Sequence, residues 1–368
     1  MSTKKDKFTK KDHFYMNLAL KLARSRQGLT GKNPSVGCVI VKDNKIISIG
    51  LTGYNGRPHA ETNAINSCNE NLDTATMYIT LEPCSHYGKT PPCTKLIINK
   101  KVKKVYYAID DIDKKVKGKS YKILKSKKIF VKKGLLKNDI NNFYEPYKYN
   151  RKKKIPYTTG KIAVSKNDLI YSEVNKKITD IYSDKLTHFL RYKNDSLMIT
   201  HRTLNIDNPK LNCRLKGLNK FSPKRIILDN NLQMLTNSYI FKTANKNNTI
   251  IFYNNASKKK ISLFKKKGIQ LIKSTLIHNR YFNLNLILKK LYLLGCRNLL
   301  VEGGDNLTNS FIKKKLFNQF YLFKSPKNLP KSTIYKEFNS FVSLSQNYKN
   351  ISKINTNLGK DSITLYKR

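Results

Sequence analysis

Four residues in the first hundred positions have the types and the spacing to hold a metal ion and to move protons beside it. His59 is followed two positions later by Glu61, and eight residues lie between Cys84 and Cys93. One imidazole and two thiolates suit the borderline softness of zinc. Three protein ligands would leave the fourth position of a tetrahedral zinc ion open for water, whose pKa zinc lowers toward about 7. The set therefore predicts a hydrolytic zinc centre.

Glu61 is the predicted general acid/base of this centre. It is near enough to His59 in the sequence to face the reacting water without binding the metal. Hydrolytic removal of an exocyclic amine from a nitrogen heterocycle needs a strong nucleophile and a group that carries its proton to the leaving amine. The alternative is a closed structural zinc site, with His86 or Cys68 as a fourth ligand. We expect His86 to line the pocket and Cys68 to pack on its helix.

The bulk composition restricts the partners and the location. The 368 residues include 73 Lys and Arg against 23 Asp and Glu, a formal net charge of +50. The lysines are spread along the chain with many Asn, Ile and Tyr, which indicates biased residue usage, so we expect no specific nucleic acid; an anionic small substrate fits the positive charge. Six cysteines do not make a disulfide scaffold, and no stretch is apolar for a membrane-spanning length. We expect a cytoplasmic protein with no membrane partner.

The elements of the first half alternate in a way that predicts one α/β domain. Asp12 is the expected N-cap of a first helix, whose apolar positions include Phe14. Asp43-Asn44 predicts a tight turn between two strands. The expected strands are 36–41, 45–51, 76–81 and 104–109, with helices at 12–27, from about 59 and after 92, and a last helix and strand within 121–131. This order favours a sheet covered by helices, a three-layer α/β/α arrangement.

A second domain is expected after a boundary near residue 150. The basic run 151–154 ahead of Ile155-Pro156 is typical of a linker, so the predicted domains are 1–150 and 151–368. Strands are expected at 158–164, 196–200, 225–229, 249–253, 269–272 and 298–301, with helices at 180–192 and 284–294. The Lys/Asn-rich stretches 242–260 and 326–350 are expected to be loops or edges. This second half is also predicted to be α/β.

Three strings in the first half carry a family resemblance. H-x-E followed by P-C and a second Cys is the signature of zinc nucleobase deaminases, most of which have P-C-x2-C. Here the strings are PHAE at 58–61, PCSHYGKTPPC at 83–93 and NPSVGCVIV at 33–41. Together they resemble the bifunctional riboflavin-biosynthesis deaminase/reductase family. The resemblance implies a cytidine-deaminase-like fold for the first domain, a diamino-ribosylamino-pyrimidinone 5′-phosphate as substrate, and Asn33 as a substrate contact.

The second half resembles the reductase of the same family, which has a dihydrofolate-reductase-like α/β fold and uses NADPH to open a ribose into ribitol. The run TLNIDNPKLNCR at 203–214 is similar to the family's T-V-x-x-D-x-P-x-L-x-x-R, and KIAVS at 161–165 to its first strand. By this resemblance NADPH would contact Ala163, Lys177, Thr203, Asp207, Leu211, Asn230, Gly304, Asp305, Asn306 and Leu307. The substrate would contact Asn175, Arg191, Arg214, which would hold its phosphate, and Glu302.

The pair Gly303-Gly304 has a physical reading of its own. Two glycines between a strand and a helix let backbone N–H groups approach a phosphate closely. The alternative is a plain turn with Asp305 as a helix cap, which would imply no ligand at all.

Two departures from the family concern the reductase. The family's S-L-D-G-R is replaced by Ser165-Lys166-Asn167-Asp168-Leu169, so its aspartate and glycine look displaced and its basic residue lost. The Trp of the family's W-I-T is Lys177, and the chain has no Trp. Hydride transfer mainly needs orientation of cofactor and sugar, so we expect a working but altered reductase.

Two other functions stay open at this point. One is an RNA-editing deaminase that recruits tRNA through its basic surface, and the other is a zinc-stabilised binding protein without an open metal position. The long spacing between Cys84 and Cys93 and the reductase-like motifs speak against the first of these. The sequence does not determine the oligomeric state, and a homo-oligomer remains one option.

Overall fold

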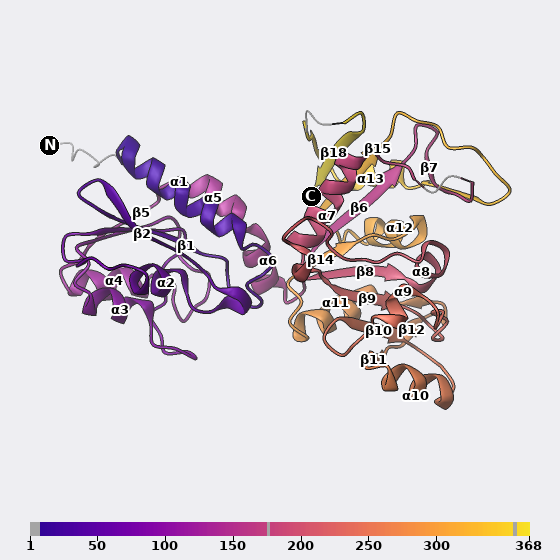
Figure 1. The fold of residues 1–368 in the computed structure, drawn as a ribbon, viewed down its shortest axis with the longest axis horizontal. Coiled ribbons are helices and arrows are strands. Elements are labelled where there is room, and N and C mark those ends of the chain that lie inside the picture. The colour runs from indigo at the N-terminus through magenta and orange to yellow at the C-terminus, as the bar shows by residue number, and fades with distance from the viewer. Residues whose placement is uncertain (1–7, 175–176, 356–358) are drawn as a thin grey trace. The chain divides into compact units, whose positions relative to one another are not determined.

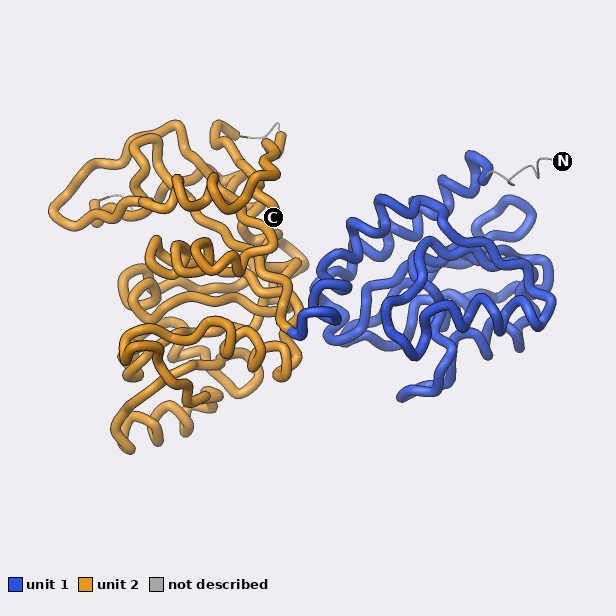
Figure 2. The backbone as a smooth tube through the Cα atoms, turned by 180° about the vertical axis from the view of Figure 1, so that it is seen from behind, with its two compact units in different colours: residues 1–154 blue, residues 155–368 orange. Residues whose placement is uncertain are grey.

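The computed structural model describes residues 8–174, 177–355 and 359–368. The chain divides into two compact units between Lys154 and Ile155 (Figure 2). The basic run expected to form an open linker is instead the last turn of helix α6 (Glu145–Lys153), which Lys154 ends in a left-handed conformation with φ of 59°. The helix tolerates these three positive charges because they lie at its negative C-terminal end.

The first unit is a sheet covered by helices on both faces (Figure 1). Its sheet has the order β2-β1-β3-β4-β5; β1 pairs antiparallel with β2 and β3, whereas β3, β4 and β5 are parallel. Helices α1 and α5 lie on one side and α2, α3 and α4 on the other, so the three-layer prediction is confirmed. The strands are β1 (Gly37–Lys42), β2 (Lys45–Leu51), β3 (Thr76–Ile79), β4 (Lys104–Tyr107) and β5 (Phe130–Lys133). The helices are α1 (Lys10–Ser25), α2 (Ala60–Asn66), α3 (Cys93–Asn99), α4 (Lys119–Ser126), α5 (Lys137–Phe143) and α6, with the 3-10 turn η1 (Tyr54–Gly56).

Local sequence explains the start of this unit, with two corrections. Thr9, and not Asp12, is the N-cap of α1, because Thr9 and Asp12 form a reciprocal capping box. Phe14 is 62% exposed, and the buried face of the helix is Tyr15, Met16, Ala19, Leu20 and Ala23. The turn predicted at Asp43-Asn44 is confirmed, since both residues have positive φ, as a tight hairpin turn of type I′ requires.

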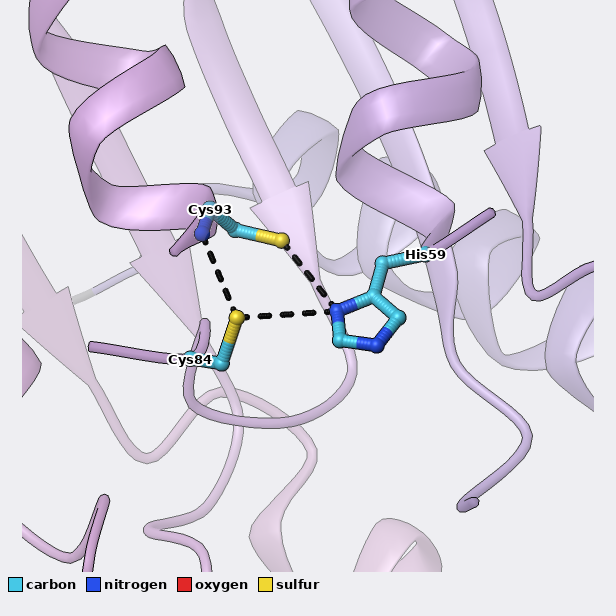
Figure 3. Close-up of side chains that lie close together, drawn as sticks. All are labelled: His59, Cys84 and Cys93. Carbon is cyan, nitrogen blue, oxygen red and sulfur yellow. Dashed lines mark hydrogen bonds between the residues drawn. The ribbon is translucent and has the colours of Figure 1, made fainter. Parts of the chain in front are cut away.

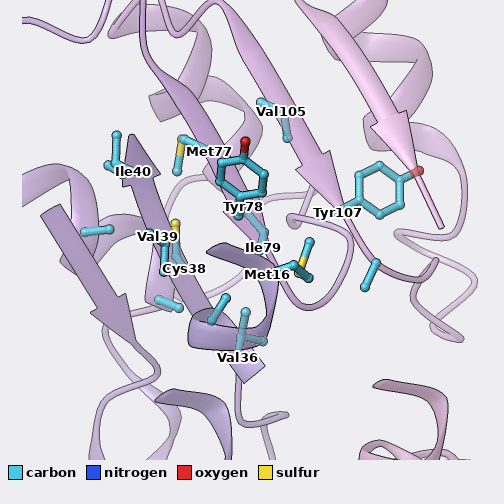
Figure 4. Packing of buried hydrophobic residues seen from close by; sticks show 14 of the residues in the cluster. Met16, Val36, Cys38, Val39, Ile40, Met77, Tyr78, Ile79, Val105 and Tyr107 are labelled. Atoms are coloured by element: carbon cyan, nitrogen blue, oxygen red, sulfur yellow. The ribbon is translucent and has the colours of Figure 1, made fainter. Parts of the chain in front are cut away.

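The core of the first unit lies on both faces of the sheet and includes buried residues of α1, α2, α3 and α4 packed on the central strands, part of which Figure 4 shows. Gly37, the first residue of β1, is where helix and strand approach most closely. A Cβ atom at Gly37 would lie 1.9 Å from the carbonyl oxygen of Ala19 in α1. The close packing of α1 on this sheet therefore requires glycine at this position.

The second unit is built on a nine-stranded sheet with the order β11-β10-β9-β8-β14-β6-β15-β18-β17. The strands from β11 to β15 are parallel, and β18 and β17 extend the sheet antiparallel. The sheet strands are β6 (Tyr157–Val164), β8 (Ser196–Thr200), β9 (Lys224–Leu228), β10 (Thr249–Tyr253), β11 (Gln270–Lys273), β14 (Asn298–Val301), β15 (Gln319–Lys324), β17 (Asn350–Lys353) and β18 (Ser362–Lys367). Two hydrophobic clusters pack against it, one containing Phe311, Phe317 and Phe320 and the other Leu197, Ile227 and Ile251.

The helices and short pairings of this unit complete an α/β domain. The helices are α7 (Ile181–Lys193), α8 (His201–Asp207), α9 (Tyr239–Lys242), α10 (Lys258–Lys266), α11 (Leu284–Leu293), α12 (Asp305–Lys313) and α13 (Phe341–Asn347), with the 3-10 turn η2 (Asn219–Phe221). Outside the main sheet, β7 (Leu169–Ser172) pairs with β16 (Tyr335–Glu337), and β12 (Leu276–Ile277) with β13 (Tyr281–Phe282). The predicted α/β class of the second half is confirmed.

The Lys/Asn-rich stretches are more ordered than expected. Positions 242–260 contain the strand β10, which was expected at 249–253 and lies inside the sheet between β9 and β11, and 326–350 contain β16 and helix α13 with buried Leu344 and Tyr348. The prediction of loops or edges was therefore wrong for these parts, because a few apolar residues among lysines are enough to anchor an element to the core. Among the described residues, no helix is long and apolar enough to cross a membrane.

We predict that Gly37→Ala destabilises the first unit by about 2 kcal/mol or more, because the added methyl group meets backbone that cannot move aside. Thermal unfolding of the full chain measures this as an earlier transition of that unit. Gly88→Ala is the matched control, since a Cβ there meets only the end of the Arg57 side chain at 3.7 Å. Equal melting temperatures for the two variants would contradict the prediction.

Candidate active sites

The structure brings the side chains of His59, Cys84 and Cys93 together (Figure 3). His59 directly precedes α2, Cys84 lies in the loop after β3, and Cys93 is the first residue of α3. The His59 Nδ1 atom lies 3.5 Å from Cys84 Sγ and 3.4 Å from Cys93 Sγ, and the three donor atoms lie within 4.8 Å of one another. The sequence predicted this group from types and spacing alone.

The three residues fit a zinc ion by the chemistry of their donor atoms. One imidazole nitrogen and two sulfurs converge, and the Cys93 N–H donates to Cys84 Sγ at 3.2 Å, a bond that favours a thiolate. Hydrogen bonding with Cys93 is the largest effect that lowers the pKa of Cys84, to about 4. In the described residues, the group able to hold a metal has these three members only, which is the set expected of an open site.

The two alternative ligands stay outside this group. The Cys68 thiol donates to the carbonyl oxygen of Glu70 at 3.7 Å, and its side chain packs against the core from a position just after the end of α2, not from the helix as predicted. His86 lies in the loop between the two cysteines, where its Nδ1 atom is buried with no hydrogen-bond partner. A buried, unsatisfied nitrogen in this loop is a group that a ligand could satisfy.

Glu61 lies in the first turn of α2, two residues after His59, and only 4% of its surface is exposed. Burial is the largest effect on this carboxyl group and raises its pKa to about 7, although the positive His59 ring opposes the change. A carboxyl group with this pKa can both accept and release a proton near neutral pH. The site thus has a metal-binding group and a proton carrier side by side.

Asn33 lies in a loop that is joined to the segment before His59. Its Nδ2 atom donates to the carbonyl oxygen of Gly56 at 2.9 Å. Arg57 then links this segment to the loop of the two cysteines, because its Nη1 atom donates to Thr90 Oγ1 at 2.5 Å. The predicted substrate residue is therefore connected to the metal-binding group through hydrogen bonds.

Sequence reasoning missed the role of Glu82, which is buried two residues before Cys84. Its carboxylate accepts backbone N–H groups of Asp111, Gly118 and Ser120 at 3.0–3.1 Å, and Ser120 Oγ donates to the carbonyl oxygen of Pro83 at 2.5 Å. These bonds fix the loop that carries Cys84. An acidic residue between a strand and the P-C pair was the available signal, but its partners are 29 or more positions away.

In the second unit, Arg191 and Glu302 form a two-pronged ion pair. The Nη2–Oε2 distance is 2.7 Å and the Nε–Oε1 distance is 2.9 Å, with side chains only 11% and 13% exposed. Burial alone would raise the pKa of Glu302, but the Arg191 guanidinium outweighs it, so the pKa is lowered. Lys161 in β6 lies in the same surroundings. Burial lowers the pKa of its ammonium group, and the negative charge of Glu302 opposes this change. The sequence analysis did not assign Lys161 to a site.

Asn212 gathers three basic side chains beside this pair. Its carbonyl oxygen accepts Arg191 Nη1 at 3.2 Å and His188 Nδ1 at 3.1 Å, and its Oδ1 accepts Arg214 Nη1 at 3.1 Å. Because a carbonyl oxygen only accepts, the His188 proton must be on Nδ1. Burial and the two arginines lower the pKa of His188, so the ring is neutral in the free protein near pH 7. The predicted substrate residues Arg191, Arg214 and Glu302 are thus close together.

Four of the predicted cofactor residues, Gly304 to Leu307, lie at the start of α12, and this helix is nine residues long. Gly304, and not Asp305, precedes the helix as its N-cap, and a Cβ at Gly304 would meet only Thr203 Oγ1, at 4.0 Å. The Asp305 carboxylate accepts Ser340 Oγ at 2.7 Å. The backbone at Gly304 is therefore open, as close approach of a phosphate requires.

Asn230 supports a ligand on this side of the unit, because its Oδ1 atom is buried with no hydrogen-bond partner. An open glycine at a helix N-terminus together with an unsatisfied amide fits a phosphate-bearing dinucleotide such as NADPH. Other predicted cofactor residues are less available. Leu211 and Leu307 are buried, and the Lys177 ammonium lies 3.8 Å from Asp184. Ala163 lies in β6, Asp207 ends α8, Asn306 follows Asp305, and Asn175 lies outside the described residues.

The segment that departs from the family forms a complete turn, so its residues are not displaced. Asn167 Oδ1 accepts Ser165 Oγ and the Leu329 N–H, at 2.7 and 2.9 Å. Asp168 occupies the place of the family's glycine with φ of 63°, a left-handed conformation that aspartate tolerates, and pairs with Lys324 at 3.0 Å. Only the basic residue is missing, because Leu169 is buried in its place.

The two folds and their sites define a zinc-dependent deaminase joined to an NADPH-dependent reductase. The family model of the cytidine and deoxycytidylate deaminase zinc-binding region matches residues 9–109, and the RibD C-terminal domain matches residues 168–350. The chain belongs to the RibD family, the bifunctional deaminases and reductases of riboflavin biosynthesis.

Relatives match the chain over nearly its full length. The riboflavin biosynthesis protein RibD of Aquifex aeolicus is 33% identical over 97% of this chain and 98% of its own, and that of Buchnera aphidicola is 32% identical over 95% and 97%. Acinetobacter baumannii RibD has a TM-score of 0.83 at 26% identity over 97% and 99% of the two chains. A deaminase/reductase from Thermotoga maritima has a TM-score of 0.82 at 28% identity, over 97% and 98%.

We predict that Arg191→Met destabilises the second unit at pH 7 by about 3–5 kcal/mol, because it leaves the Glu302 carboxylate buried without its partner. Without Arg191, burial raises the pKa of Glu302, so the folded variant holds a proton that the unfolded chain releases. Its stability should therefore fall as the pH rises from about 4.5 to 7.

In the native chain the stability should instead rise with pH. The lowered pKa of Glu302 makes a stabilising contribution, and this contribution is lost as the pH falls below about 4.5. Unfolding in denaturant at pH 5 and pH 7 measures the difference. Arg191→Met combined with Glu302→Gln is the control and should recover most of the loss at pH 7. A deficit of equal size at both pH values would contradict the pairing.

Proposed function

We propose that His59, Cys84 and Cys93 hold the catalytic zinc of the deaminase and that Glu61 moves its protons. The observation that carries this proposal is the convergence of three donor atoms within 4.8 Å beside a buried carboxyl group whose pKa is about 7. Zinc, when bound, supplies a Lewis acid that makes water a strong nucleophile at neutral pH. Glu61 accepts the proton of the attacking water and delivers it to the leaving amine, which departs as ammonia.

The proposed substrate is 2,5-diamino-6-ribosylamino-4(3H)-pyrimidinone 5′-phosphate, whose pyrimidinone loses one exocyclic amine in the first unit. The Thermotoga relative is titled a diaminohydroxyphosphoribosylaminopyrimidine deaminase and 5-amino-6-(5-phosphoribosylamino)uracil reductase, which supports this assignment. Asn33 contacts the substrate from the loop that Gly56 holds in place.

The second unit reduces the ribosyl group of the deaminated product to ribityl with NADPH, giving 5-amino-6-ribitylaminouracil 5′-phosphate. Gly304 and the start of α12 receive a phosphate of the cofactor, Thr203 lies beside them, and Asn230 offers an unsatisfied acceptor. Arg214 receives the substrate phosphate, and the pair of Arg191 and Glu302 orients the sugar. The protein's part is orientation, because the cofactor carries the hydride.

The partners, the location and the oligomeric state are proposed as the sequence analysis predicts them. We propose phosphorylated pyrimidines as partners without a specific nucleic acid, because the family's two activities account for both units without RNA. All six cysteines are free, which fits a reducing, cytoplasmic location. A homo-oligomer stays an open option that sedimentation of the purified chain would decide.

We predict that Glu61→Gln lowers ammonia release by at least about 10²-fold while zinc stays bound, because it removes the proton carrier and no ligand. An assay of the purified chain with the diamino-pyrimidinone phosphate follows ammonia release and NADPH oxidation separately. Given the deaminated intermediate, the variant should oxidise NADPH at the native rate. Cys93→Ser is the contrasting variant and should lose zinc. Loss of zinc from Glu61→Gln, or native ammonia release by it, would refute the assignment.

We predict that Arg214→Gln raises the KM of the reductase for its phosphorylated intermediate by about tenfold or more, because it removes a charge-assisted bond to phosphate. The KM for NADPH should stay unchanged. Lys216→Gln is the matched control, since it removes an equal charge from an exposed position two residues away. The same KM in both variants would mean that Arg214 acts only through the general positive field.

A further inference from the structure

Helix α6, with Tyr144 at its start, is hydrogen-bonded to three segments that are far apart in the sequence and border the zinc-binding group. Tyr144 is fully enclosed in the core. Its hydroxyl group lies 2.7 Å from Thr80 Oγ1 and donates to the carbonyl oxygen of Ser35 at 2.9 Å. Because the one hydroxyl proton of Tyr144 goes to Ser35, Thr80 Oγ1 donates to Tyr144, and it also accepts the Gly37 N–H at 3.1 Å. Tyr144 thus joins the end of the Asn33 loop to the end of β3.

Tyr147 reaches the third segment, one turn further along α6. Its hydroxyl group donates to Asp111 Oδ1 at 3.1 Å, and the Asp111 N–H donates to Glu82 Oε2 at 3.1 Å. Glu82 precedes Cys84 by two residues and holds that loop through its other N–H partners. A short path of hydrogen bonds therefore leads from α6 to the loop of a metal ligand.

Arg151 binds the Asn33 loop a second time, from the last turn of the same helix. Its Nη2 atom donates to the carbonyl oxygen of Lys32 at 3.0 Å, directly before Asn33. The guanidinium also lies over the Tyr147 ring, 5.3 Å from its centre, which restricts both side chains. The Asn33 loop is thus held at Ser35 by Tyr144 and at Lys32 by Arg151.

We propose that Tyr144, Tyr147 and Arg151 are positioning residues of the deamination reaction. Fixing loop backbone costs conformational entropy, and anchors formed on folding meet this cost before the substrate arrives. The helix orders the Asn33 loop, which contacts the substrate, and the Cys84 loop, which holds the metal. This inference rests on the proposed roles of Asn33 and of the zinc-binding group.

The end of α6 is also the boundary between the two units. Only Lys154, Ile155 and Pro156 separate this helix from β6, the first strand of the second unit. A boundary drawn at residue 150 would cut the helix before Arg151. The variants below all change the first unit, so native reduction shows that the second unit is folded, and zinc content reports on the fold of the first.

The experiment compares Arg151→Gln with Lys152→Gln in the full-length enzyme. Both remove one positive charge from the same turn, but Lys152 is exposed and Arg151 holds the Asn33 loop. We expect Arg151→Gln to raise the deamination KM by about tenfold with kcat changed by less than about threefold, because one charged hydrogen bond is lost. Zinc content and reduction of the deaminated intermediate should be native, and Arg151→Lys should recover part of the KM.

Equal deamination KM values for Arg151→Gln and Lys152→Gln would overturn the proposal. So would a KM increase that comes with zinc loss or that Arg151→Lys leaves unchanged, since either result assigns Arg151 to folding alone. Tyr147→Phe tests the second path and should lower deamination kcat with native reduction. Glu61→Gln in the same series distinguishes failure of the proposed function from failure of this inference. Native ammonia release by Glu61→Gln would refute the proposed function. Loss of ammonia release in Glu61→Gln together with native deamination by Arg151→Gln would refute only the role of α6.

Discussion

Both active sites depend on carboxylates that are taken out of water and must find their partners within the chain. Burying a carboxylate is costly unless hydrogen bonds or an opposite charge compensate it. Glu82 is compensated by three backbone N–H groups, and Glu302 by the Arg191 guanidinium, so each fixes the segments around it. Glu61 is buried as deeply, and burial raises its pKa to about 7; burial also raises the pKa of Glu82, although the N–H groups that bind its carboxylate oppose the change. The same physical cost thus gives structure in two cases and proton chemistry in the third.

The fold meets this constraint by placing the active groups where elements begin and end. His59 and Cys93 stand at the starts of α2 and α3, and Glu302 and Gly304 between β14 and α12. Helix starts and strand ends leave backbone groups available to bind, whereas the interior of an element has none to spare. Hydrogen bonds from distant segments then order these loops, as Asn212 does for three basic side chains.

The altered turn of the reductase shows how a family pattern can change without loss of its geometry. The pattern suggested that an aspartate and a glycine were displaced, but Asn167 and Asp168 keep the turn in register. Aspartate is among the few residues that accept a left-handed backbone, and its pairing with Lys324 holds it there. The loss of the basic residue is a real difference, because Leu169 packs into the core instead. No aromatic ring replaces the missing tryptophan at Lys177 itself, which pairs with Asp184.

The sequence by itself determined the α/β class of both halves, most strands and the zinc-binding residues, because alternating apolar runs and ligand spacing are local properties. Helix α13 was concealed by lysine and asparagine, since composition does not show which few apolar side chains reach the core. Only the tertiary structure decided what holds the sites: the hydrogen-bond partners of Glu82, Arg191 and Tyr147 lie between 21 and 111 positions away. Contacts over such separations depend on how the sheets order their strands, which no local pattern records.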